Sequence, residues 1–300
     1  MDAKTSLGGH VIAVLNLGSS NCDASSADKV QRIFQAAGLS QAEILAVEPA
    51  KLEEALDDAA ARADVIVVLG GDGSICSAAI KCGVAGKFLI PLPGGTMNML
   101  PRGLYGELNW EEALADTLAD PISHDVSGGV AEGHLFFCAA ILGPPGLWAD
   151  VREALRTGDL VSAIKCAGTA IRRSHDKALS FKFGGDESGV AEAVIVVCPL
   201  ISRGLAENER SLEAAAVKAH TTATDFFRIA FHAIFDDWRR DPAIHCTKVS
   251  SVRVTGRSQI PVILDGEKVR LGRTINIEFA SKAFRAIIPA GKVVGSISSL

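Results

Sequence analysis

The feature that most constrains the fold is a short apolar run at residues 64–69, Asp-Val-Ile-Val-Val-Leu, which leads directly into Gly70-Gly71. An apolar run without alternation is typical of a strand that is covered on both faces. The first third of the chain contains several such runs, and they alternate with segments of helical periodicity. Strands are expected at 10–15, 42–47, 64–69 and 88–91, and helices between Ser25 and Gly38 and at 52–62, 75–81 and 109–118.

This alternation predicts a parallel sheet with helices on both of its faces. Two of the expected helices begin with a capping-box pattern, Ser25 with Asp28 and Asn109 with Glu112. In such sheets ligands bind beyond the carboxyl ends of the strands. Two glycine-rich segments, 70–74 and 93–96, follow strands and therefore lie where a ligand is expected.

The sequence pattern of the chain changes after about residue 125. Short, often alternating segments follow one another and predict an antiparallel β sandwich, with helical stretches at 147–173 and 223–239. We therefore predict an α/β domain of residues 1–125 plus 289–300 and a β-rich domain of residues 126–288. The strand-like segments are 122–129, 134–140, 179–183, 191–198, 212–217, 248–254, 261–264, 274–279 and 283–288.

Composition narrows the classes of function. The chain of 300 residues has a net charge of −5, which argues against a nucleic-acid-binding protein and means that an anionic membrane must be met by a local basic patch. No apolar stretch approaches the ~20 residues that span a bilayer, and residues 1–9 lack a signal-peptide pattern. Seven scattered cysteines without zinc-ligand spacing indicate reduced thiols, so we expect a cytoplasmic protein without zinc.

The segment Gly70-Gly71-Asp72-Gly73-Ser74 is the first candidate for chemistry. Glycines after a strand leave backbone N–H groups uncovered, and the helix that follows points its positive end at the same place, so a phosphate would be stabilised there. Asp72 fits such a site if its carboxylate meets Mg²⁺ or a ligand hydroxyl. The alternative is a tight strand–helix turn in which Asp72 caps the helix.

Two further segments have the same ambiguity. Residues 91–98, Pro-Leu-Pro-Gly-Gly-Thr-Met-Asn, offer close backbone approach together with the polar side chains of Thr96 and Asn98, or form a plain loop with Asn98 as a helix cap. Residues 264–267, Leu-Asp-Gly-Glu, contain a carboxylate pair, but Asp-Gly is also a common hairpin turn.

Together, in this order and spacing, the three segments resemble the diacylglycerol kinase catalytic family, which includes bacterial lipid kinases and sphingosine kinases. Asn16 is similar to the asparagine of that family's first-strand loop. The resemblance extends over nearly the whole chain. It implies two domains, an N-terminal α/β domain like that of NAD kinases, which binds nucleotide, and a C-terminal β-rich domain, which binds the acceptor.

The resemblance also implies roles for individual residues. ATP would lie in the cleft between the domains and Mg²⁺ would accompany it, with Asp72 as the metal ligand. Asp265 would accept a proton from the acceptor hydroxyl, and Glu267 would stand beside it for metal or water. The nucleotide would be held by Asn16, Gly70, Gly71, Asp72, Gly73, Ser74, Gly95, Thr96 and Asn98.

This sequence also departs from the family's pattern. Where related lipid kinases carry an Asp-Asp-Gly segment that binds a structural Mg²⁺, this chain has Asn208-Glu209-Arg210. We therefore expect a kinase that phosphorylates a lipid, and attachment to the inner membrane surface is one location that this substrate would allow. Two alternatives stay open, a catalytically weak nucleotide- or lipid-binding protein and a soluble-metabolite kinase of the NAD kinase type. A homodimer through exposed sheet edges is also open.

Overall fold

The structure is a computed structural model, and it describes residues 7–143, 178–185, 187–202, 204–205, 209–217 and 244–291. The helices predicted at 147–173 and 223–239, and Asn208, lie outside the described residues. The chain divides into two compact units, the first of Met1–Gly128 with Ala280–Ser299 and the second essentially of Gly129–Phe279. The division into domains at residues 125 and 289, which we drew from the sequence, stays a prediction.

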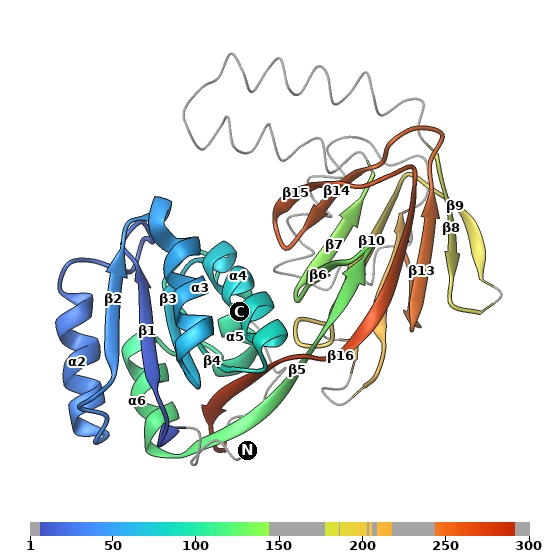
Figure 1. Ribbon diagram of the computed structural model, residues 1–300. Coiled ribbons are helices and arrows are strands. Elements are labelled where there is room, and N and C mark those ends of the chain that lie inside the picture. The colour runs from blue at the N-terminus through green and yellow to red at the C-terminus, as the bar shows by residue number, and fades with distance from the viewer. Residues whose placement is uncertain are drawn as a thin grey trace. The chain divides into compact units, whose positions relative to one another are not determined.

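The first unit is built on a parallel sheet (Figure 1). Its order is β2 (Glu43–Val47), β1 (Val11–Asn16), β3 (Val65–Gly70) and β4 (Phe88–Pro93), and the end of the long strand β16 (Thr274–Pro289) pairs in parallel with β4. The prediction of a parallel α/β sheet is confirmed. Every residue of β3 is buried, as expected for a strand covered on both faces.

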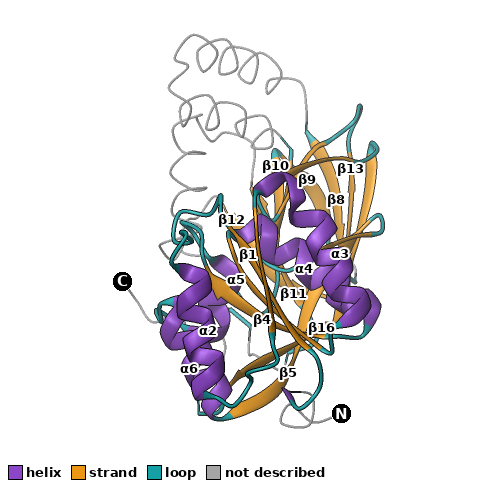
Figure 2. Ribbon diagram, turned by 60° about the vertical axis from the view of Figure 1, so that its left-hand side comes forward, coloured by secondary structure: helices purple, strands orange, loops and turns teal. Residues whose placement is uncertain are grey.

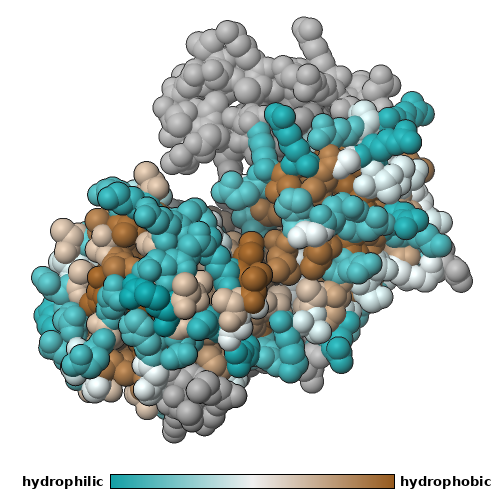
Figure 3. Space-filling model, viewed as in Figure 1, coloured by the Kyte–Doolittle hydropathy of each residue, from teal (hydrophilic) through white to brown (hydrophobic). Residues whose placement is uncertain are grey.

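Helices cover both faces of this sheet (Figure 1). One pair, α3 (Leu52–Arg62) and α4 (Asp72–Ala85), packs together on one side, and α2 (Ser26–Ala36) packs with α6 (Trp110–Ala119) on the other. Two short helices complete the unit, η1 (Pro49–Lys51) before α3 and α5 (Met99–Tyr105) after β4. Helix α5 begins directly after Asn98, the residue for which the sequence left a helix cap as the alternative. Figure 3 shows hydrophilic residues spread between apolar ones over the visible surface of this unit.

Helix α4 is longer than the predicted helix at 75–81. It begins at Asp72 and passes through Gly83, where we expected it to end, before it stops at Gly86 in the left-handed conformation. A β-carbon at Gly83 would lie 2.2 Å from the carbonyl oxygen of Ala283 on β16. Gly83 is therefore a point of close packing between helix and strand, which a glycine permits without ending the helix.

The second unit is a sandwich of two sheets (Figure 2). One sheet is antiparallel in the order β12 (Ile244–Val249), β11 (Leu212–Val217), β10 (Ala193–Val197), β7 (Ala139–Leu142), β14 (Pro261–Leu264) and β15 (Glu267–Arg270). The other contains β16, β13 (Ser251–Thr255), β8 (Leu179–Phe183) and β9 (Ser188–Ala191), with β5 (Pro121–Ala131) paired to β16 and β6 (His134–Phe136) paired to β5. Side chains of both sheets form one core, so the predicted sandwich is confirmed.

Several predicted strands are divided or joined. The strand predicted at 134–140 is two strands, β6 and β7, because the backbone between them turns its N–H groups toward Asp265. The strand predicted at 248–254 is divided at Ser250 between β12 and β13. The two strands predicted at 274–279 and 283–288 are the single strand β16, although Lys282 within it has a φ of 54°.

Among the described residues, no helix is long and apolar enough to cross a membrane.

Candidate functional site

The carboxyl ends of three neighbouring parallel strands bring the first two motifs together. β1 ends at Asn16, β3 at Gly70 and β4 at Pro93, and the register pairs Gly70 with Pro93. Just beyond this pair, the N–H of Gly94 donates to the carbonyl of Gly70 at 2.9 Å. The two glycine-rich segments therefore lie side by side at the edge where ligands bind in such sheets.

The first glycine-rich segment requires glycine at two positions of the second one. A β-carbon at Gly94 would lie 2.7 Å from the backbone nitrogen of Gly70, and one at Gly95 would lie 2.6 Å from the α-carbon of Gly71. Both distances are shorter than real side chains allow. The backbone of the first segment thus leaves no room for a side chain at Gly94 or Gly95.

Asn16 joins the end of β1 to the first turn of α4. Its Nδ2 donates to Ser74 Oγ at 2.9 Å, and its Oδ1 accepts from the N–H of Gly18 at 3.0 Å. Ser74 is buried and Asn16 is half-buried. The structure thus brings these two predicted site residues together.

The loop after β1 contributes two residues that the sequence reading missed. Ser19 Oγ accepts from the N–H of Gly71 at 3.1 Å. Asn21 donates its backbone N–H to Gly94 O at 2.9 Å and its Nδ2 to Gly95 O at 3.1 Å. The loop therefore fastens both glycine-rich segments from one side. The signal was available as the polar run Ser19-Ser20-Asn21 directly after a buried strand, at the same sheet edge as the two motifs.

Asp72 occupies the first turn of α4 but points its carboxylate at another helix. Its Oδ1 accepts from the N–H of Met99 at 2.6 Å, at the start of α5. Burial raises the pKa of Asp72, and backbone hydrogen bonds from Met99, Asn98 and Leu100 oppose that rise. The predicted cap by Asp72 on its own helix is wrong: the N-cap of α4 is Gly71, and the Asp72 carboxylate binds the start of α5 instead.

Asn98 holds the segment between β4 and α5 in shape. It is buried and adopts the left-handed conformation, with a φ of 50°. Its Oδ1 accepts from the N–H of Gly95 at 2.7 Å, and its Nδ2 donates to Gly95 O at 2.8 Å. Thr96, between them in sequence, is exposed. Gly95 and Asn98 therefore form one closed turn that presents Thr96 to solvent.

The internal hydrogen bonds leave one clear place for an anion. The N–H groups of Gly71, Gly94 and Gly95 are engaged within the motifs. The first three N–H groups of α4, those of residues 72–74, have no carbonyl one turn earlier in the helix to accept them. With the positive end of a 14-residue helix behind them, these groups suit a phosphate.

Asp265 lies in the second unit, in a two-residue turn between β14 and β15. Asp265 has a φ of 48° and Gly266 a φ of 91°, and Leu264 pairs with Glu267 across the turn. Positive φ at both central residues is the geometry of the tight Asp-Gly hairpin turn. The hairpin alternative is thus realised at this motif.

The Asp265 carboxylate accepts three consecutive backbone N–H groups. Its Oδ2 accepts from Phe137 at 2.7 Å, and its Oδ1 accepts from Cys138 at 2.8 Å and from Ala139 at 2.9 Å. These three bonds hold the carboxylate of Asp265 in one fixed direction. Glu267 is exposed at the start of β15.

The residues present do not fit the structural Mg²⁺ that the resemblance implies. The Glu209 carboxylate pairs with Lys248, whose Nζ lies 2.9 Å from both of its oxygens. The carboxylate that a metal would need is therefore already paired with a cation, and the next residue in the sequence is a further cation, Arg210. Within the described part of the chain, no group of three or more His, Cys, Asp or Glu residues is placed to hold a metal ion.

Comparison with known proteins agrees with this architecture. Residues 10–129 match the model of the diacylglycerol kinase catalytic domain. No curated protein sequence matches the chain. Three solved structures from Bacillus anthracis str. Sterne, described as "a putative diacylglycerol kinase", "a diacylglycerol kinases" and again "a putative diacylglycerol kinase", are similar in fold. Their TM-scores are 0.72, 0.69 and 0.67 at 20%, 17% and 19% identity, and each match covers 95% of this chain and 98% of the other.

The match to the family includes the first two motifs and ends at residue 129, before Asp265. At the identities found, the solved structures establish the fold alone. The resemblance predicted from the three motifs is thereby confirmed: over residues 10–129 this chain matches the diacylglycerol kinase catalytic domain, and it shares the fold of three solved structures described as diacylglycerol kinases.

Proposed function

We propose that this protein is a kinase that transfers the γ-phosphate of ATP to a hydroxyl group of a diacylglycerol-like or sphingoid lipid. The observation that carries the proposal is the closed arrangement around the first turn of α4. Asn16, Ser19 and Asn21 hold the two glycine-rich segments against each other, and the N-terminal N–H groups of α4 remain for an anion. Phosphoryl transfer depends mainly on such positioning and on charge neutralisation.

In this proposal the nucleotide phosphates bind at residues 70–74, with Gly95, Thr96 and Asn98 beside them. Mg²⁺ enters with ATP and neutralises phosphate charge, and Asp72 is the carboxylate of this site that could contact it. Because the Asp72 carboxylate already caps α5, its main part in the proposal is to fix the segment that ends at Asn98.

Asp265 is the proposed residue that receives the proton of the acceptor hydroxyl, with Glu267 two residues away. Its three backbone donors fix the direction of its carboxylate, and a general base must be fixed in this way to meet the proton of a hydroxyl group. General bases of this kind typically contribute about 10²- to 10⁴-fold to a rate.

The second candidate function is that of a nucleotide- or lipid-binding protein with little or no turnover. The observation that favours it is the same hydrogen-bond set, because holding the backbone of residues 137–139 gives Asp265 a structural role that requires no catalysis. A second observation is the ion pair between Glu209 and Lys248. It lies where the resemblance implies a structural Mg²⁺ site in related lipid kinases.

The test is phosphate transfer from radiolabelled ATP with Mg²⁺ to a panel of lipids dispersed in uncharged detergent micelles, for the natural chain and for Asp265→Asn. ATP binding by both proteins is measured by calorimetry. We expect labelled lipid from the natural chain, at least about 100-fold less from the variant, and equal ATP binding. ATP binding without label on any lipid would overturn the lipid kinase and support the binding protein.

A further inference from the structure

The end of the β14–β15 hairpin opposite Asp265 carries a cluster of arginines. Loop 256–260 and loop 271–273 meet there, and we call residues 256–261 and 270–273 the arginine tip. They include Arg257, Arg270 and Arg273, all exposed, and no acidic residue. The chain as a whole has a net charge of −5, so the tip is opposite in sign to the rest of the protein.

Hydrogen bonds between the two loops hold the tip in one conformation. The N–H of Gly256 donates to Arg273 O at 2.7 Å, and the N–H of Ile260 donates to Gly272 O at 3.2 Å. The Gln259 side chain adds a bond from Nε2 to Leu271 O at 2.9 Å. The three arginines are therefore kept near one another by the backbone, although like charges repel.

The arginines of the tip lack the partners that other cations of this protein have. In the first unit Lys29 pairs with Glu111, Arg62 with Glu43 and Asp58, and Lys81 with Glu53 and Asp57. In the described ranges, Arg257, Arg270 and Arg273 have no acidic partner and no side-chain hydrogen bond. Their charge is thus available to an external anion.

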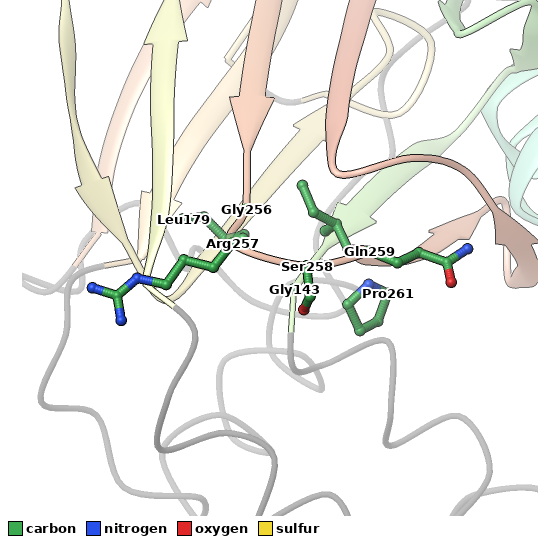
Figure 4. Close-up of a pocket in the computed structure, with 8 residues that line it drawn as sticks. Gly143, Leu179, Gly256, Arg257, Ser258, Gln259 and Pro261 are labelled. Carbon is green, nitrogen blue, oxygen red and sulfur yellow. The ribbon is translucent and has the colours of Figure 1, made fainter.

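The shape of the tip favours an extended surface over a small ligand. The hollow lined by Gly143, Leu179 and residues 256–261 has a volume of about 10 Å³, which is room for about one water molecule. Figure 4 shows the Arg257 side chain extending away from this hollow, toward the outside. A phosphate group could not enter the hollow, whereas a flat anionic surface could meet the arginines together.

We propose that the arginine tip is the surface by which this protein docks on an anionic lipid bilayer. This proposal rests on the proposed function, since a lipid kinase must reach its acceptor in a membrane. Nucleic acid is the less favoured partner, because the residues of the tip include no aromatic side chain on which a base could stack. Each arginine close to an anionic bilayer contributes roughly a fivefold gain in binding.

The experiment is sedimentation of the full chain with vesicles, in the absence of ATP. Vesicles of phosphatidylcholine alone are compared with vesicles that also contain phosphatidylglycerol. The variant Arg257→Gln/Arg270→Gln/Arg273→Gln is compared with a control that loses the same charge at dispersed exposed sites, Arg32→Gln/Lys51→Gln/Lys182→Gln. Thermal unfolding confirms that both variants fold.

We expect the natural chain to bind only the anionic vesicles, with an affinity that falls as salt rises. The tip variant should bind about 100-fold more weakly, and the control within about twofold of the natural chain. Equal binding by the tip variant, or equal binding to uncharged vesicles, would overturn the proposal. So would displacement by inorganic phosphate at constant ionic strength, or tighter binding to a labelled oligonucleotide.

The result of the vesicle experiment can be distinguished from the result of the kinase assay. A tip variant that still phosphorylates lipid in uncharged micelles but binds no vesicles supports docking and leaves the kinase intact. A natural chain that binds anionic vesicles through the tip and phosphorylates nothing keeps the docking surface while the kinase fails.

Discussion

Two aspartates, each followed by glycine, do similar structural work in the two units but in different surroundings. Asp72 lies at the start of a helix and accepts N–H groups from the first turn of α5. Asp265 lies in a hairpin turn at positive φ and accepts the N–H groups of Phe137, Cys138 and Ala139. Both carboxylates fasten a neighbouring segment of backbone.

The difference lies in what each carboxylate could do beyond that. Asp72 is half-buried between two helices, where burial raises its pKa and so disfavours its charged form. Asp265 is also half-buried, but it sits in a turn between strands. An Asp-Gly pair is therefore not a sign of chemistry by itself, and it is the proposed function that gives Asp265 a part in catalysis and Asp72 a part in the architecture.

The largest expected effect is the contrast in turnover between Asp265→Asn and Asp72→Asn. The first variant removes the proposed proton acceptor and should lower kcat by about 10²- to 10⁴-fold. The second keeps an oxygen that can accept from Met99, so we expect a loss within about tenfold. The measurement is kcat for lipid phosphorylation in uncharged micelles, with calorimetric ATP binding as the control.

An equal loss in both variants would break the comparison. It would mean that the charge of Asp72 takes part in the reaction, as a ligand of the Mg²⁺ that accompanies ATP.

The next effect separates a glycine needed for close approach from one that is not. Gly95→Ala would place a methyl group 2.6 Å from the α-carbon of Gly71, which forces the two segments apart. Overpacking of this kind costs about 1–3 kcal/mol, and we expect ATP binding to weaken as well. Urea denaturation and calorimetry measure the two effects.

The matched control is Gly272→Ala in the second unit, where the nearest atom to a new methyl group is 3.6 Å away. We expect a change in unfolding free energy below about 0.5 kcal/mol there. A tolerated Gly95→Ala would show that the two segments are not packed as tightly as the distances imply.

The general architecture could be predicted because it depends on repeated local patterns. The apolar runs and helical periodicities located β1 to β4 and most helices of the first unit, and short alternating segments indicated the sandwich. What could not be predicted depends on contacts distant in sequence. Gly83 looks like a helix stop until Ala283 is known to lie against it, and residues 137–139 look like strand until Asp265 takes their N–H groups.

The candidate site shows the same limit. Asn16, Ser74, Gly71 and Gly95 were predicted and lie together, but the part played by Ser19 and Asn21 depends on segments more than 50 residues away. The partner of Asp72 was also beyond local reasoning, since its hydrogen bond joins it to Met99, which is 27 residues further along the chain.

The two predicted capping boxes also differ, although their sequence patterns are similar. Asn109 and Glu112 form the reciprocal capping box at the start of α6. Ser25 makes no side-chain cap bond at α2, because its hydroxyl donates to Asp23 at 2.6 Å; the predicted box with Asp28 is wrong. We expect Asn109→Ala to cost about 1 kcal/mol and Ser25→Ala less than about 0.5 kcal/mol, measured by urea denaturation. Equal costs would contradict the assignment.

The smallest expected effect is the pH dependence of the contribution that Asp72 makes to folding stability. Because burial raises the pKa of Asp72 in the folded protein, the unfolded chain releases this proton first as pH rises. The folded state then binds more protons than the unfolded state, so the contribution of Asp72 to stability falls from about pH 4 upward until its folded pKa is passed. Asp72→Asn lacks this titration and should gain stability relative to the natural chain between pH 4 and 7.

Urea denaturation at several pH values measures that difference, with the exposed Asp116→Asn as the reference for general charge effects. A relative loss of stability by Asp72→Asn as pH rises would mean that the folded protein favours the charged carboxylate. The hydrogen bonds from α5 would then outweigh burial, and Asp72 would be a held anion like Asp265, available to a cation that arrives with the nucleotide.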